Sequence, residues 1–211
     1  LCLLIAIPVA AKQYEYQEQK GKEITPVSVT RERQGNLLRT EIVKNNVTAI
    51  SFNELNGVGA THRWQRQDGS TKIYKANREE NILTITGKAN GKPHENVAGL
   101  DDKPWLQDLG YSLAKFVKTP HRDLTFWTIQ DGELEPTVLM ARKRGPETVM
   151  VNGQSVSSRK IEVRSDDFFL KLWSGFYWFR ESDGVLVQYR SDPGIPGMSE
   201  TVGTLVEDSP K

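Results

Sequence analysis

The strongest constraint on the fold of this chain comes from five Asn-Gly or Asp-Gly dipeptides that separate runs of alternating apolar and polar residues. They are Asp68-Gly69, Asn90-Gly91, Asp131-Gly132, Asn152-Gly153 and Asp183-Gly184. A tight type I′ hairpin turn needs positive φ at both central residues, and Asn, Asp and Gly tolerate that conformation best. The dipeptides therefore predict a series of β-hairpins, which is an antiparallel meander.

Between these turns, apolar and polar residues alternate along the sequence. Val27 and Val29 share one face of their segment, and further β-branched and aromatic residues alternate in the same way along most of the chain. We expect about a dozen strands, among them residues 38–42, 47–52, 61–66, 71–76, 81–86, 124–129, 134–142, 148–151, 156–164, 168–180 and 185–190. Residues 200–206 are expected to form a last edge strand.

One segment has the helical period instead. Its apolar residues recur at helical spacing and are Leu106, Leu109, Leu113, Phe116 and Val117. Asp102 is a candidate N-cap, Pro104 suits the first helical turn, and Thr119-Pro120 ends the pattern. We expect residues 91–102 to be a loop that leads into this helix. Since a helix and a sheet each bury one face, the helix should pack on the sheet.

The predicted fold class is therefore mainly β, as a strongly curved antiparallel sheet or an unclosed β-barrel with one packed α-helix. Neither a long linker nor an internal repeat divides the sequence, so we expect a single domain over residues 12–211.

The first eleven residues differ from the rest. They read LCLLIAIPVAA, an apolar run too short to span a bilayer, with Val9 and Ala11 at the −3 and −1 positions of a cleavage site. We expect residues 1–11 to be the remainder of a secretory signal peptide that lacks its charged beginning; the alternative is a buried N-terminal strand. Removal of Cys2 with this segment would leave a chain without thiols, which suits the periplasm.

Composition and motifs exclude several function classes. The 28 Lys and Arg residues nearly balance the 27 Asp and Glu residues, so no overall basic field favours nucleic acid. One Cys and three isolated His residues do not make a metal-binding pattern. The sequence has no phosphate-binding loop, dinucleotide fingerprint or nucleophile elbow. We therefore expect no metal, no cofactor and no enzymatic activity, unless His62 or His121 lies beside a carboxylate in a cleft.

Aromatic residues are the most informative functional feature. The segment 168–179, FFLKLWSGFYWF, is apolar on both faces, as expected of a strand covered on both sides. One interpretation is an ordinary core, and the other is an apolar cavity between a curved sheet and the helix. The residues expected to line this cavity are Trp127, Trp173, Trp178, Leu109, Leu113 and Phe116.

Several motifs in residues 120–192 resemble an uncharacterised family of secreted bacterial envelope proteins. They are the Val151-Asn152-Gly153-Gln154 turn, the Lys160–Val163 strand, the Leu172-Trp173 pair and the hairpin at residues 183–187. The resemblance implies a periplasmic or cell-envelope protein with an unclosed barrel similar to the lipoprotein-localisation carriers. In those carriers a concave face and a helical lid hold acyl chains, although they usually contain more helix than the one found here.

These observations predict a periplasmic protein, or one at the periphery of the outer membrane of a Gram-negative bacterium, that binds a lipid or another hydrophobic molecule. The alternative is an envelope scaffold or assembly factor that contacts another protein through its strand edges. We expect neither a nucleic-acid partner nor a transmembrane span after residue 11.

Overall fold

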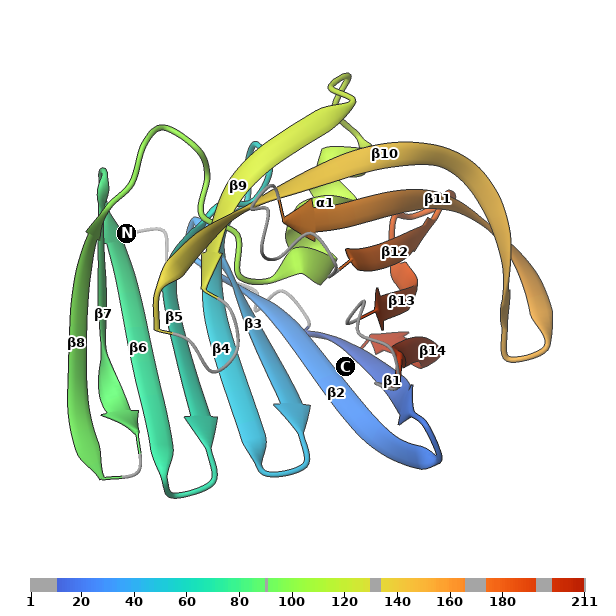
Figure 1. The fold of residues 1–211 in the computed structure, drawn as a ribbon. Helices are drawn as coiled ribbons and strands as arrows, with labels where there is room; N and C mark the ends of the chain where they lie inside the picture. The colour runs from blue at the N-terminus through green and yellow to red at the C-terminus, as the bar shows by residue number, and fades with distance from the viewer. Residues whose placement is uncertain (1–10, 90, 130–133, 166–173, 193–198, 211) are drawn as a thin grey trace, which may run out of the picture.

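A computed structural model describes residues 11–89, 91–129, 134–165, 174–192 and 199–210. These residues form one helix, α1 (Leu109–Val117), and one antiparallel sheet of fourteen strands (Figure 1). The strands are β1 (Lys12–Lys20), β2 (Glu23–Gln34), β3 (Leu37–Lys44), β4 (Val47–Glu54), β5 (Thr61–Asp68), β6 (Lys72–Glu79), β7 (Ile82–Ala89), β8 (Lys92–Gly99), β9 (Asp123–Ile129), β10 (Pro136–Val151), β11 (Gln154–Ser165), β12 (Ser174–Arg180), β13 (Leu186–Asp192) and β14 (Thr201–Pro210).

The sheet consists of two meanders joined at their centre. From β1 the chain adds one strand after another out to β8, then passes through α1 to β9 and returns strand by strand to β14. Strand β14 pairs with β1, so the order is β8-β7-β6-β5-β4-β3-β2-β1-β14-β13-β12-β11-β10-β9. The sheet curves around α1 without closing (Figure 1). The predicted fold class, an unclosed antiparallel barrel with one helix, is confirmed.

Several predicted turns lie where the dipeptides placed them. Asn152 and Gly153 have φ values of 51° and 76°, and they join Val151 to its partner Gln154 in a two-residue turn. Positive φ at both positions is the property for which the Asn-Gly signal selects. The predicted turns at Asn90 and at Asp131-Gly132, and nearly all of the proposed signal peptide, lie outside the described residues.

Four sequence predictions about secondary structure are wrong. The two strands expected over residues 134–142 and 148–151 are the single strand β10. Residues 92–99 form strand β8 rather than a loop, because their backbone pairs with β7 along its whole length, although few of their side chains are buried. Strand β14 is central rather than an edge, because it pairs with both β1 and β13. The helix begins at Leu109 and its N-cap is Asp108, not Asp102.

The displaced helix start has a structural cause. Residues 104–106 are extended and lie between the outer edge of β9 and the start of β5. Trp127 donates its backbone N–H to the carbonyl of Pro104 and accepts from the N–H of Leu106, both at 2.8 Å, while Thr61 donates to the carbonyl of Trp105 at 2.7 Å. The side chain of Trp105 is fully buried between these strands. Leu106 is thus apolar because it is core, not because it belongs to the helix.

The buried apolar residues form two clusters. The larger one surrounds α1 and contains Leu113, Phe116 and Phe126 with residues of β1, β2 and β10–β14. The smaller one surrounds Trp105 and contains Trp64 and Leu83 with other residues of β5–β7. Gln107, which immediately precedes the helix cap, is hydrogen-bonded to Trp105 and Ile129 of the smaller cluster.

Gly87 of β7 lies very close to the neighbouring strand β6, and a side chain would not fit at this position. A Cβ at this position would lie 2.5 Å from the backbone carbonyl oxygen of Ile73 and 2.7 Å from the ring of its cross-strand partner Tyr74. The backbone of β6 cannot shift as easily as the end of a flexible side chain could. The clash in Gly87→Ala should therefore lower the free energy of unfolding by about 1–3 kcal/mol. Urea denaturation measures this loss.

The matched control is Gly99→Ala. No atom lies within 4 Å of a Cβ at Gly99, which is the next glycine in the neighbouring strand β8. We expect a change within about 0.5 kcal/mol for this surface variant. Equal effects of the two substitutions would contradict the close packing described for Gly87.

Candidate functional site

The three predicted site residues of the helix lie in the larger cluster. Leu113 and Phe116 are fully buried, and Leu109 packs against the cluster while half-buried. They contact the concave face of the sheet, as the helical spacing predicted. These side chains line neither the cavity of about 350 Å³ nor the cavity of about 630 Å³ that are described below.

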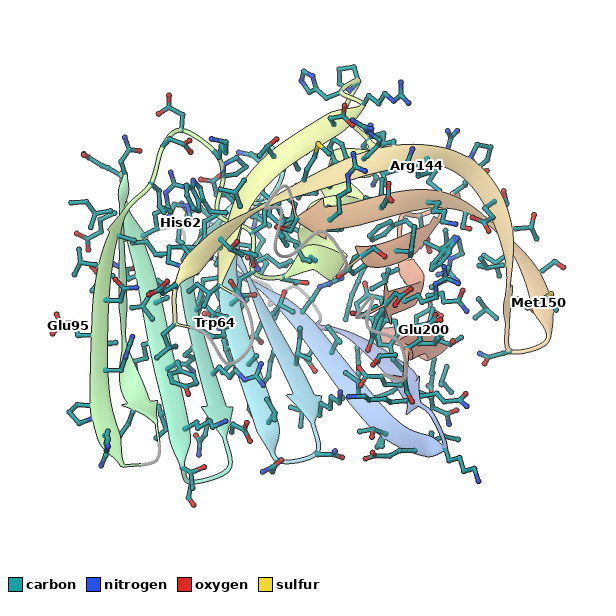
Figure 2. The ribbon with its side chains drawn as sticks, in the orientation of Figure 1. His62, Trp64, Glu95, Arg144, Met150 and Glu200 are labelled. Atoms are coloured by element: carbon teal, nitrogen blue, oxygen red, sulfur yellow. The ribbon has the colours of Figure 1, made fainter. Side chains whose placement is uncertain are left out.

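The predicted tryptophans are dispersed. Trp127 packs against the smaller cluster, and its indole N–H donates to Asp101 Oδ1 at 2.8 Å. Trp178 is buried, and its indole N–H donates to Glu147 Oε2 at 3.1 Å. Glu147 belongs to the long β10–β11 hairpin, which arches over the strands beside it and carries Met150 near its tip (Figures 1 and 2). Trp173 lies outside the described residues.

A buried ion pair fixes the start of the helix. Asp108 caps α1 by accepting from the N–H of Tyr111 at 3.0 Å, and its two carboxylate oxygens lie 3.2 and 3.3 Å from Nη2 of Arg31 on β2. The side chains are 3% and 14% exposed. Burial is the largest single influence and lowers the pKa of Arg31, but the carboxylate of Asp108 and the phenols of Tyr16 and Tyr14 together raise this pKa above its ordinary value, so the guanidinium stays charged. The helix is therefore held to β2 through its cap.

The candidate site is a cavity of about 350 Å³ between the two apolar clusters. It is lined by Glu18 of β1, Ile42 and Lys44 of β3, Asn45 and Asn46 of the following turn, Val47 and Ala49 of β4, Trp64 and Arg66 of β5, and Gln107. Figure 2 labels Trp64 on β5. Ile42 pairs with Val29 and with Ala49, whose side chains lie on the same face of the sheet as the core. The cavity therefore belongs to the concave side, with the β3–β4 turn at its rim.

One wall of the cavity is polar, and an ion pair and a hydrogen bond hold its carboxylate in place. Glu18 pairs with Lys44 and accepts from the phenol of Tyr189 at 2.7 Å. Burial, followed by the hydrogen bond to Glu18, raises the pKa of Tyr189 far above its ordinary value. The phenol thus stays a neutral donor that holds the Glu18 carboxylate in place. Tyr189 in turn stacks on Tyr177, with ring centroids 6.4 Å apart.

Gln107 lines the cavity, and its side chain is held by hydrogen bonds to β9 and to Trp105. Its amide nitrogen donates to the carbonyl of Ile129 at 2.9 Å, and its amide oxygen accepts from the Ile129 N–H at 3.0 Å and from the indole of Trp105 at 3.1 Å. The site thus combines an apolar wall formed by Ile42, Val47 and Trp64 with charged groups near its rim. Such a combination suits an amphipathic molecule.

The described residues offer little for covalent chemistry. His62 lies 3.0 Å from Glu54, but both side chains are more than 40% exposed, and neither lines the candidate cavity. No group of three potential metal ligands occurs within the described ranges. Across the same ranges, no helix has the length and apolarity needed to cross a membrane.

Comparisons with known proteins identify a similar fold but no similar sequence. No protein-family model matches the chain, and no curated protein matches it. Among solved structures, the chain is similar to the crystal structure of a β-barrel-like protein of domain of unknown function DUF1849 from Brucella abortus, with a TM-score of 0.66 and 8% sequence identity. The match covers 97% of this chain and 99% of the other. The chain therefore has the fold of a bacterial β-barrel-like protein of unknown function, in agreement with the resemblance noted in its sequence.

Proposed function

We propose that this protein is an exported binding protein of the bacterial cell envelope, which holds a lipid or another amphipathic molecule in the cavity between β1, β3, β4, β5 and Gln107. The observation that carries the proposal is the lining of this cavity, where Ile42, Val47 and Trp64 lie beside Lys44 and Arg66. Export rests on the apolar run at residues 1–11.

Physical considerations favour this cavity over the helix–sheet contact. Leu113 and Phe116 are fully buried, so the space beneath the helix is already occupied by core. The cavity of about 350 Å³ lies at the lower end of the range of roughly 300–1,000 Å³ found for ligand sites. An apolar chain placed against Trp64 would gain about 25 cal/mol per Å² of buried surface before association costs. Its polar end would face Lys44 and the rim.

The scaffold alternative finds less support in the strand edges. Residues 104–106 occupy the outer edge of β9. The outer edge of β8 contains Pro93, which lacks a backbone N–H, and the charged residues Lys92 and Glu95. Proline and charges at an edge strand oppose pairing with another chain. Ligand binding on the concave side is therefore the better-supported function.

A fluorescent fatty-acid probe tests the proposal. The wild-type protein should bind the probe and lose most of this binding in Ala49→Trp, because the indole would fill the cavity. Val47→Trp, nearer the rim, should weaken binding as well. The matched control is Thr48→Trp on the opposite face of the same strand, which should bind like the wild type. Titrations of fluorescence against protein concentration measure the affinities.

Circular dichroism and thermal unfolding establish that each variant is folded. Absence of probe binding by the wild type would contradict the proposal. So would equal affinities of folded Ala49→Trp, Val47→Trp and Thr48→Trp, because the probe would then bind elsewhere.

A further inference from the structure

A second cavity lies apart from the proposed ligand site, where the end of α1 meets strands β10 and β11 and the β12–β13 turn. Its volume is about 630 Å³. The residues that line it are Val117, Lys118, Thr119, Lys143, Gly145, Arg159, Lys160, Ile161, Arg180, Glu181 and Gly184. We call it the basic cleft, because five of these side chains are cationic and only Glu181 is acidic.

Three of the five cations in the basic cleft have acidic partners. Arg159 pairs with Glu181 at 2.7 Å, and Lys160 pairs with Glu147 at 3.1 Å. Arg180 lies 2.7 Å from Asp183 and also pairs with Asp208. These pairs hold the side chains in position. They also leave the cleft with a positive excess, which resides on the other two cations, Lys118 and Lys143.

Neither Lys118 nor Lys143 has a carboxylate partner among the residues that the structure describes. The ammonium group of Lys143 donates to the carbonyl of Thr119 and lies 4.8 Å from the centre of the Phe116 ring. An ammonium has three donors, so two remain after this hydrogen bond. Lys118 is exposed at the end of the helix.

The surroundings of Lys143 are those of a cation that lacks a counter-ion. Burial lowers its pKa, and the positive charge of Arg159 lowers it further. A bound anion would oppose both effects. The ammonium is also held between a carbonyl and an aromatic ring, so little rotamer freedom would be lost on binding.

We propose that the basic cleft binds a phosphate group, with Lys118 and Lys143 as its principal contacts and Arg159 and Arg180 as flanking charges. Ammonium and guanidinium groups form short, charge-assisted hydrogen bonds with phosphate oxygens. The cleft is large enough for a phosphate together with the organic group that bears it. This inference concerns a different cavity from the proposed amphiphile site and does not depend on it.

Calorimetric titration with inorganic phosphate and cosedimentation with phospholipid vesicles test the inference. The protein should bind phosphate, vesicles containing phosphatidylglycerol, or both, and binding should weaken as salt is raised. Replacing Lys118 and Lys143 together by Gln should weaken binding by about tenfold or more. The matched control replaces Lys22 and Lys88, two exposed lysines outside the cleft, by Gln and changes the net charge equally.

The two ligands distinguish the source of the phosphate. Phosphate binding without vesicle binding would identify a soluble ligand, whereas binding to phosphatidylglycerol vesicles but not to phosphatidylcholine vesicles or free phosphate would identify an anionic lipid headgroup. A wild-type protein that binds neither would overturn the inference. Equal weakening in the cleft and control variants would also overturn it, because the effect would then follow net charge alone. Thermal unfolding of both variants excludes loss of fold as the cause.

Discussion

Replacing Asp108 by Ala should lower the free energy of unfolding by about 3–5 kcal/mol, because it leaves the buried guanidinium of Arg31 without its partner. The same change removes the N-cap of α1, a contribution of about 1 kcal/mol. Domains of this kind are stable by only about 5–15 kcal/mol, so the variant should unfold at a much lower urea concentration. Urea denaturation followed by circular dichroism measures the loss.

Two further variants separate the ion pair from the cap. Asn is as good an N-cap as Asp, so Asp108→Asn removes the charge while keeping the hydrogen bond to Tyr111. We expect it to retain the cap contribution and lose that of the pair. Adding Arg31→Met to Asp108→Asn should restore part of the stability, because no unpaired charge then remains buried. A loss below about 1 kcal/mol for Asp108→Ala would contradict the structural importance of the pair.

Replacing Trp105 by Ala should have an effect of similar size. Its side chain is fully buried in the smaller cluster, and large-to-small changes of buried aromatic residues cost about 3–5 kcal/mol. Its backbone carbonyl accepts from Thr61, and its neighbours on either side bond to β9. Amide hydrogen exchange should therefore accelerate most in β5 and β9, the two strands joined by residues 104–106.

Val97→Ala is the matched control for Trp105→Ala. Val97 lies on β8 and is 61% exposed, so its truncation should change stability by at most about 0.5 kcal/mol. If hydrogen exchange in Trp105→Ala accelerated uniformly over the whole sheet, the proposed local role of residues 104–106 would be wrong.

The strands could be predicted where alternating apolar residues are bounded by residues that favour tight turns. Val27 and Val29 alternate because one face of β2 is core, and Asn152-Gly153 forms a tight turn because both residues accept positive φ. Strand β8 was missed because its pairing with β7 is made by backbone, while its side chains are mostly exposed and show no alternation. The start of the helix was misplaced because Leu106 is buried for a reason unrelated to helical periodicity.

The candidate site could not be predicted in the same way. Its lining combines Glu18, Lys44 and Trp64 with Gln107, and these residues are brought together only by strand order and by the extended segment before the helix. Aromatic content pointed to Phe116 and Trp178, which the structure buries in the larger cluster. Large apolar side chains in a sequence indicate where the core lies. A cavity instead forms where side chains are small, as at Ala49, and this depends on which strands are neighbours.

The central claim is that an amphipathic molecule binds on the concave side of the sheet. Native mass spectrometry tests it most directly, on protein purified from a Gram-negative periplasm. We predict that the wild type and Thr48→Trp carry the additional mass of a lipid or similar molecule and that Ala49→Trp does not. Detection of the bare protein mass alone for the wild type, also after incubation with fatty acid, would contradict the claim.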